Sequence, residues 1–232
     1  MIMSENDRVK IAYDKRKEQV PRYRYSLFNK GNLQHLQERE SVLLKMIKRF
    51  VTLPLADKCV LDIGCGKGGT LLPLLYYGFA PPNCYGVDIL EESVKKAREL
   101  LPHANFTHCS AQHLPFENEK FDLVTMFTCL SSVLEYQIRK EICLETQRVL
   151  KNNGVAIIYD FRVNNPQNKD VKAVNLNELK SYFHGYYCES HTLTLLPPLA
   201  RFLGKYSGTI CSILAKIWFL RTHRVSCFVK RR

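Results

Sequence analysis

The sequence predicts an α/β fold: a doubly wound, mostly parallel seven-stranded sheet with helices on both faces and an antiparallel closing strand. Three observations predict it. Short apolar runs alternate with helical stretches between residues 59 and 160, as in parallel strands joined by crossover helices. A glycine-rich turn follows the first apolar run. Two further runs, residues 186–196 and 222–229, are expected to form an antiparallel closing pair.

The parallel part of the sheet is expected from short apolar runs. These runs are residues 59–63, 83–89, 121–127 and 155–160. Residues 91–98 predict a helix, because their acids come first and their bases last. Residues 137–150 predict a second helix, which carries Ile138, Ile142 and Val149 on the face that would pack on the sheet.

Glycines at positions 64, 66, 68 and 69 directly follow the first expected strand. Glycine tolerates positive φ and has no Cβ, so the backbone can turn sharply there and approach a ligand closely. The spacing also matches the dinucleotide fingerprint, which is a weak signal when it stands alone. Asp62, two residues before the first glycine, would repel a pyrophosphate and attract a cation. The pattern therefore favours a cationic nucleoside ligand.

Residues 60–66, Val-Leu-Asp-Ile-Gly-Cys-Gly, closely resemble the first motif of class I S-adenosylmethionine-dependent methyltransferases, which are Rossmann-like. S-adenosyl-L-methionine carries an ammonium and a sulfonium and has no phosphate, in agreement with Asp62. The resemblance implies that this molecule is the cofactor and that the backbone of Gly64, Cys65 and Gly66 wraps its methionine half. A glycine turn without a ligand and a nicotinamide site stay open as alternatives.

A second acid, Asp88, ends the second expected strand. An acid in this place can accept hydrogen bonds from both ribose hydroxyls. The resemblance therefore implies that Asp88 and the adjacent Ile89 bind the cofactor. A nicotinamide enzyme would look the same here, and Asp88 could also cap the helix that follows.

Residues 109–116 resemble the adenine-binding loop of the same family. Many relatives carry an acid where Ser110 stands and another near Gln112. The resemblance implies that Ser110 or Gln112 supplies a neutral acceptor instead, and that the backbone of Ala111 donates to the adenine ring. It also implies that Phe127, at the end of the fourth strand, lines the floor of the pocket.

We expect a single domain over residues 1–232. It would comprise a helical N-terminal cap over 1–50, a cofactor-binding core over 51–189, and a basic strand pair with an inserted apolar helix over 190–232. The nine cysteines are an odd number and form no Cys-x-x-Cys pair. The N-terminus lacks an apolar signal core. We therefore expect reduced thiols, no metal site and a cytoplasmic location.

The net charge of +12 is concentrated at the two ends. Residues 1–50 hold 12 Lys and Arg against 6 Asp and Glu, residues 51–189 hold 14 against 16, and residues 190–232 hold 8 against none. Basic ends indicate an anionic acceptor or partner: a phosphate-bearing small molecule, a glycan-type acceptor, nucleic acid or a membrane surface. The oligomeric state stays open.

The two ends each allow two interpretations. In the N-terminal stretch, aromatic and basic residues alternate, which suits either a lid over the cofactor or nucleic-acid binding. Class I methyltransferases often carry such a helical lid, so the lid is favoured. Residues 209–220 are apolar, with Lys216 as their only charge, and are too short for the ~20 residues that span a bilayer. They would fold onto the sheet, form a dimer contact, or lie at the inner face of a membrane.

Candidate catalytic residues lie just past the fifth expected strand. Asp160 could take a proton from an acceptor hydroxyl, and Arg162 could hold an anionic group of the acceptor. His191, on the sixth expected strand, is a further candidate. Two of the three have a structural alternative: Asp160 could be a strand-end carboxylate, and His191 a core or rim histidine.

The acceptor is predicted by exclusion and by a looser resemblance. Amide-nitrogen methyltransferases carry Asn/Asp-Pro-Pro-aromatic after the fourth strand, where this chain has Phe-Thr-Cys-Leu at residues 127–130. Residues 159–170, 196–201 and 219–223 resemble methyltransferases of bacterial surface-polysaccharide biosynthesis, which implies a sugar hydroxyl on a nucleotide- or lipid-linked glycan. A quinone or lipid acceptor, a nicotinamide-dependent oxidoreductase and a non-catalytic nucleic-acid-binding protein stay open.

Overall fold

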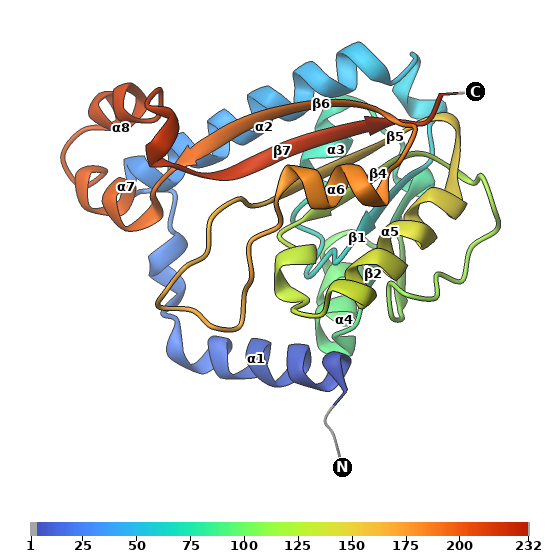
Figure 1. The fold of residues 1–232 in the computed structure, drawn as a ribbon, viewed down its shortest axis with the longest axis horizontal. Helices are drawn as coiled ribbons and strands as arrows, with labels where there is room; N and C mark the ends of the chain where they lie inside the picture. Colours follow the sequence, from blue (N-terminus) through green and yellow to red (C-terminus); the bar gives the residue numbers. More distant parts are fainter. Residues whose placement is uncertain (1–3, 232) are drawn as a thin grey trace.

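The computed structural model describes residues 4–231, apart from the side chain of Arg22 (Figure 1). Seven strands form one sheet in the order β3-β2-β1-β4-β5-β7-β6. In chain order they are β1 Val60–Ile63, β2 Cys84–Asp88, β3 Asn105–His108, β4 Phe121–Phe127, β5 Leu150–Phe161, β6 Tyr187–Leu195 and β7 Arg221–Val229. Strands β1 to β5 pair in parallel, and β7 runs antiparallel to both β5 and β6. The predicted α/β fold with an antiparallel closing strand is confirmed.

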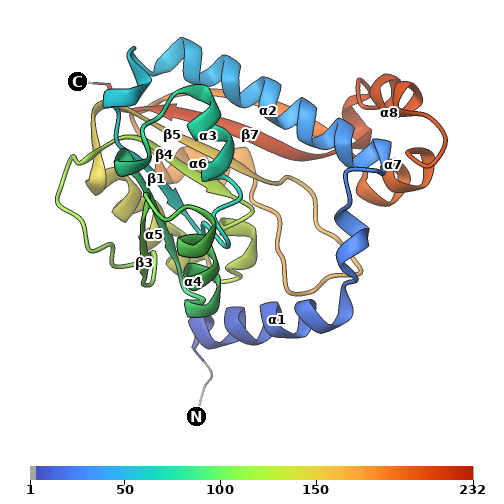
Figure 2. The same cartoon turned by 180° about the vertical axis from the view of Figure 1, so that it is seen from behind.

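Helices cover both faces of this sheet (Figures 1 and 2). They are α1 Glu5–Gln19, α2 Lys30–Phe50, α3 Leu71–Tyr77, α4 Glu91–Leu100, α5 Tyr136–Val149, α6 Leu176–Tyr182, α7 Pro197–Leu203 and α8 Gly208–Leu214. One buried cluster joins α2, α3 and α4 to the sheet, and a second joins α5 and α6 to it. No helix within residues 4–231 is both long enough and apolar enough to span a bilayer.

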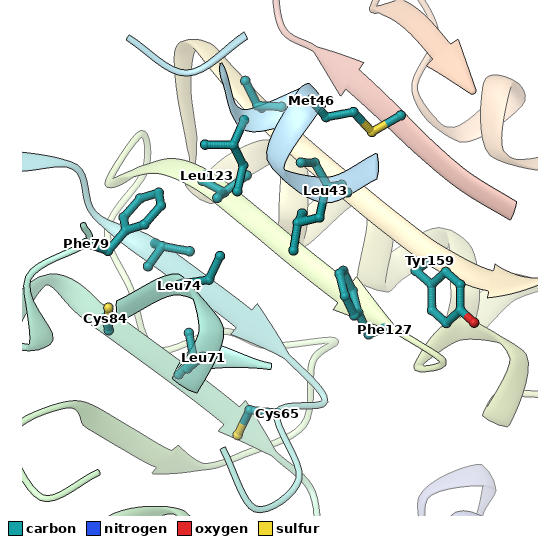
Figure 3. Packing of buried hydrophobic residues seen from close by; sticks show 14 of the residues in the cluster. Leu43, Met46, Cys65, Leu71, Leu74, Phe79, Cys84, Leu123, Phe127 and Tyr159 are labelled. Atoms are coloured by element: carbon teal, nitrogen blue, oxygen red, sulfur yellow. The ribbon is translucent and has the colours of Figure 1, made fainter. Parts of the chain in front are cut away.

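Strand alternation decides which side chains face α2. On β5, Ile157 and Tyr159 belong to the cluster under α2, α3 and α4, whereas Ile158 belongs to the cluster under α5 and α6. Figure 3 shows Leu43 of α2 above the strands, with Phe127 and Tyr159 side by side at one end of the cluster. The α2 face therefore continues to the carboxyl ends of β4 and β5.

Helix α1 lies across this carboxyl end of the sheet, next to α4 (Figures 1 and 2). Lys17 of α1 forms a 3.0 Å ion pair with Glu92 of α4. At the other end of α1, the Glu5 carboxylate accepts a hydrogen bond of 2.5 Å from the backbone of Leu134. Both ends of α1 are thus tied to the core.

The apolar helix expected over residues 209–220 is shorter in the structure. Helix α8 ends at Leu214, and a separate 3-10 turn covers Trp218–Leu220. The Arg221 Nε donates to the carbonyl of Ala215 at 2.5 Å, and its Nη1 donates to the carbonyl of Thr192 at 2.7 Å. The guanidinium of Arg221 therefore supplies a donor to the Ala215 carbonyl at the end of α8, a long-range interaction that local sequence does not reveal.

The start of α2 packs directly on α7, and two glycines allow the approach. A Cβ at Gly31 would lie 2.0 Å from the carbonyl oxygen of Ala200, and one at Gly204 would lie 2.2 Å from the backbone nitrogen of Gly31. We expect Gly31→Ala to lower the free energy of unfolding by about 1–3 kcal/mol, because the backbones must separate. Urea denaturation measures this. Gly208→Ala is the matched control, since its Cβ would only meet Lys30 at 3.4 Å; an equal loss there would contradict the explanation.

Candidate functional site

A glycine loop after β1 turns back against β2. Gly64, Gly66 and Gly68 all have positive φ, of 73°, 52° and 82°. The backbone nitrogens of Gly64 and Cys65 both donate to the Val87 carbonyl, at 2.8 and 3.0 Å. A Cβ at Gly64 would lie 2.9 Å from the Cys129 Sγ, whereas a Cβ at Gly66 would meet nothing within 4 Å. Gly64 is therefore required for packing, and the space at Gly66 is open to a ligand.

Asp62 lies at the end of β1, just before this loop, and is 1% exposed. Its Oδ1 accepts a hydrogen bond of 2.7 Å from the Thr125 hydroxyl. Its Oδ2 is buried and has no hydrogen-bond partner among the described residues. Burial raises the pKa of Asp62 to about 7, which its bond to Thr125 partly opposes. A buried carboxylate oxygen without a donor is costly, and a cationic ligand would supply that donor.

Asp88 joins the loop to the start of α4. Its Oδ2 accepts from the Gly66 nitrogen at 2.8 Å, and its Oδ1 accepts from the Leu90 nitrogen at 2.8 Å. Burial raises the pKa of Asp88, and these bonds oppose the shift. Leu90 is the N-cap residue of α4, so Asp88 supports the helix start without being the cap. Ile89 lies between Asp88 and Leu90 in the chain, and its carbonyl oxygen is 3.1 Å from His108 Nε2.

The expected adenine loop follows β3. The nitrogen of Gln112 is 3.4 Å from the Ser110 hydroxyl, and its side-chain amide donates to Glu141 of α5 at 2.7 Å. Ala111 packs against the cluster on the α5 face. Phe127 belongs to the cluster on the opposite face, so the structure does not bring it to this loop.

The α1 helix contributes Tyr13 to the same edge. Its hydroxyl is 3.1 Å from the Ser132 hydroxyl. Burial raises the pKa of Tyr13, and the carboxylate of Asp88 adds to the shift. Tyr13 therefore lies over the carboxyl ends of the strands, where a lid on the cofactor would lie.

The side chains of the three expected catalytic residues have different partners. Asp160 faces α5 and α6, accepts from the Ser131 nitrogen at 2.9 Å, and has a pKa that burial raises to about 6. The Arg162 Nη1 donates to the carbonyls of Trp218 and Arg221, at 3.2 and 2.6 Å. His191 is an exposed residue of β6, and its ring lies 3.1 Å from a carboxylate oxygen on the same strand.

Comparison with known proteins supports the reading of the glycine loop. Residues 61–158 match a family described as a methyltransferase domain. Residues 61–158 form a class I S-adenosylmethionine-dependent methyltransferase domain. S-adenosyl-L-methionine is the cofactor of this class.

Two curated relatives and one solved structure illustrate the likeness. A 2-phytyl-1,4-naphtoquinone methyltransferase of Trichormus variabilis is 36% identical over 118 residues, which cover 48% of this chain and 50% of that protein. A phthiotriol/phenolphthiotriol dimycocerosates methyltransferase of Mycobacterium tuberculosis is 32% identical over 113 residues, which cover 48% and 40%. The chain thus matches half or less of each relative's length. A SAM-dependent methyltransferase from Archaeoglobus fulgidus shares the fold at a TM-score of 0.59 and 19% identity, covering 83% of this chain and 94% of that one.

The residues at the loop fit this cofactor. The unpartnered Oδ2 of Asp62 would accept from its ammonium group, and the open space at Gly66 and Gly69 leaves room for its methionine half. The Asp88 oxygens each accept one backbone bond and can accept a second, so they would hold ribose hydroxyls.

A small open cavity of about 170 Å³ lies beside α2. Its lining includes Tyr25, Leu27, His35, Leu36, Arg39 and Tyr159. Sequence reasoning gave none of these residues an acceptor-binding role. The pattern His-x-x-x-Arg places His35 and Arg39 on one face of a helix, and that was the one signal for them.

Arg39 links this cavity to the cofactor loop. Its guanidinium carbon lies 5.3 Å from the Phe127 ring centroid and 5.9 Å from that of Tyr159. Its positive charge also opposes the rise in the pKa of Asp62. Glu40 accepts from Arg39 Nη2 at 2.7 Å and fixes the guanidinium. The cavity therefore adjoins the Asp62 end of the loop.

Two histidines lie at or next to the cavity: His35 lines it, and the buried His223 packs on Tyr159, another lining residue. Burial lowers the pKa of His35 to about 4, and its Nε2 has no hydrogen-bond partner among residues 4–231. Burial lowers the pKa of His223 to about 3, and its ring stacks on Tyr159 at 4.9 Å. The Tyr159 hydroxyl is 2.8 Å from that of Thr194. Both imidazoles are thus neutral at pH 7.

Proposed function

We propose that this methyltransferase transfers a methyl group from S-adenosylmethionine to a hydroxyl oxygen on the ring of a lipid-linked or lipid-like acceptor. The observation that carries the proposal is the cavity beside α2, where a neutral imidazole with an unpartnered nitrogen adjoins the cofactor loop through Arg39. The two curated relatives are named for a phytyl naphthoquinone and for dimycocerosates, both of them lipids. These names support a lipid acceptor.

The size of the cavity supports binding of one ring at a time. Ligand pockets for whole drug-sized molecules are about 300–1,000 Å³. A volume of about 170 Å³ accommodates the reacting ring, while the rest of the acceptor stays outside. Tyr25, which is 51% exposed, offers an aromatic surface for a sugar or quinol ring. Sugar O-methylation remains the favoured case, and a quinol is the second.

His35 is the residue that we propose to orient the acceptor. When bound, the cofactor supplies an electrophilic methyl group. The neutral His35 Nε2 is buried and has no partner among the described residues, and we propose that a side-chain movement at the cavity opens it to an acceptor hydroxyl. It would then accept a hydrogen bond from that hydroxyl and hold its oxygen in line for transfer. Arg39 would bind an oxygen or a phosphate of the acceptor, because its guanidinium is positively charged. For Asp160 we propose a positioning role, because it fixes the turn at Ser131.

We expect His35→Ala to lower methyl transfer about tenfold, because the acceptor loses one orienting hydrogen bond. S-adenosylhomocysteine binding should stay unchanged in calorimetry. The assay follows tritiated methyl from the cofactor into chloroform-soluble lipid, glycan, RNA and protein fractions of a cell extract. Gln37→Ala, an exposed change on the same helix, is the matched control.

Label in the lipid-soluble fraction that falls with His35→Ala but not with Gln37→Ala supports the proposal. Label that enters only RNA or protein in the wild type would overturn it. Mild acid hydrolysis of the labelled lipid distinguishes a sugar carried on a phosphate linkage from a quinol, since only the sugar is released into water.

A further inference from the structure

The segment from residue 196 to 220 forms a small tip that projects from the start of α2 (Figures 1 and 2). Asn29 Nδ2 donates to the Arg201 carbonyl at 2.9 Å, and the Lys30 nitrogen donates to the Gly204 carbonyl at 3.2 Å. A separate small core of Leu195, Ala200, Cys211 and Ala215 holds α7 and α8 together. The tip is therefore an ordered unit with a defined inner side.

The surface of this tip carries many apolar and aromatic side chains. Its large exposed side chains are Leu196, Phe202, Tyr206, Ile210, Ile213, Trp218 and Phe219. Trp218 is 67% exposed and Phe219 is 66% exposed, and their rings lie 6.1 Å apart. The adjoining chain adds Phe28, which is fully exposed. So many large apolar side chains outside a core indicate a contact surface.

The charges around these side chains are all positive on the C-terminal segment. Residues 190–232 contain eight Lys and Arg and no Asp or Glu. Lys205 and Lys216 are exposed on the tip, and the Arg162 guanidinium lies 5.9 Å from the Trp218 ring. Aromatic rings with lysines and arginines, and without carboxylates, suit the headgroup region of an anionic bilayer. A second copy of the same basic surface would be repelled.

We propose that the tip docks on the surface of an anionic lipid bilayer, with Trp218 and Phe219 inserted at headgroup depth. The position of the cavity gives this contact a use. Tyr25 and Leu27, which line the cavity, are about half exposed. The tip lies next to this chain segment, as is shown by the pKa of Arg201, which burial and the charge of Arg24 both lower. Docking would bring a lipid-linked acceptor to the cavity from the bilayer. The docking itself requires neither cofactor nor acceptor.

The single tryptophan of the chain makes docking directly observable. We expect the emission of Trp218 to shift to shorter wavelength with vesicles of phosphatidylcholine and phosphatidylglycerol at 3:1, and brominated lipid to quench it. Pure phosphatidylcholine vesicles should give at least tenfold weaker binding, and added salt should weaken binding to the anionic vesicles. No shift with anionic vesicles would overturn the proposal, whatever the outcome of the methylation assay.

Two variants test the surface itself in vesicle sedimentation. Phe202→Ser with Phe219→Ser should weaken binding at least tenfold, because two apolar side chains no longer leave water. Tyr76→Ser is the control, since Tyr76 is 83% exposed on α3, outside the tip. Lys205→Glu with Lys216→Glu should also weaken binding, with the exposed Lys48→Glu as its control. Equal effects of tip and control variants would overturn the proposal. The proposal would also be overturned if the wild type bound no vesicles and the tip variants instead abolished a dimer or a complex with an acidic protein.

Discussion

Asp62→Asn is expected to weaken S-adenosylhomocysteine binding about 10- to 100-fold at pH 8, because the ligand ammonium loses a charged acceptor. The Asp62 Oδ2 is buried and has no partner within hydrogen-bond distance among residues 4–231, so it can accept from the ligand ammonium. Asn keeps the size of the side chain and can still accept from Thr125, which isolates the charge. Calorimetry measures the dissociation constant.

The same carboxylate predicts a pH dependence. Burial raises the pKa of Asp62 to about 7, so the group is mostly protonated at pH 6 and ionised at pH 8. If the ionised form binds the ammonium, affinity should fall about tenfold from pH 8 to pH 6. Asp62→Asn should remove this dependence. An equally steep pH profile in the variant would contradict the assignment.

The stability of the ligand-free protein provides the control. A carboxyl whose pKa rises from its usual value of 3.8 to about 7 on folding binds its proton more tightly in the folded state. Its contribution therefore lowers stability as pH rises between those two values. Asn carries no such charge, so Asp62→Asn should be at least as stable as the wild type at pH 8. A strongly destabilised variant would mean that lost binding reflects lost structure.

The cofactor half of the site was predictable from sequence because its parts are close in the chain or fixed by strand ends. Gly64 and Gly66 directly follow β1, and Asp88 ends the neighbouring parallel strand. Parallel strands place their carboxyl ends at one edge, so a motif after one strand meets an acid after the next. The hydrogen bond from the Gly66 nitrogen to Asp88 confirms that these two segments meet.

The proposed acceptor half of the site was not predictable in the same way. His35 and Arg39 are more than a hundred positions from Tyr159, and only the docking of α2 on the sheet brings them together. An amphipathic pattern shows that a helix has a buried face, but not which strand end that face covers. The face of the sheet to which the Asp160 side chain points could be predicted from the sequence. It follows Tyr159 on a strand, so the two side chains must point to opposite faces of the sheet.

Arg139→Met is expected to lower the free energy of unfolding by about 3–5 kcal/mol, because it breaks a buried ion pair and leaves buried acceptors without donors. Arg139 is 2% exposed. Its Nη1 lies 2.9 Å from Glu178 Oε1, and its other nitrogens donate to the carbonyls of Val133 at 2.6 Å and Lys172 at 2.9 Å. Urea denaturation measures the loss. Lys140→Met, the exposed neighbour on α5, should have little effect.

A double variant separates the ion pair from the backbone bonds. Adding Glu178→Leu to Arg139→Met removes the unpaired carboxylate, so the pair of changes should cost less than the sum of the single changes. Strict additivity would mean that the carbonyl contacts alone carry the effect. The loss of the backbone bonds of Arg139 should remain in the double variant.

Arg139 also holds the turn whose Ser131 nitrogen donates to Asp160 and whose Ser132 hydroxyl lies close to the hydroxyl of Tyr13 on α1. Releasing that turn frees α1, so protease cleavage within residues 5–19 should rise in Arg139→Met before the sheet unfolds.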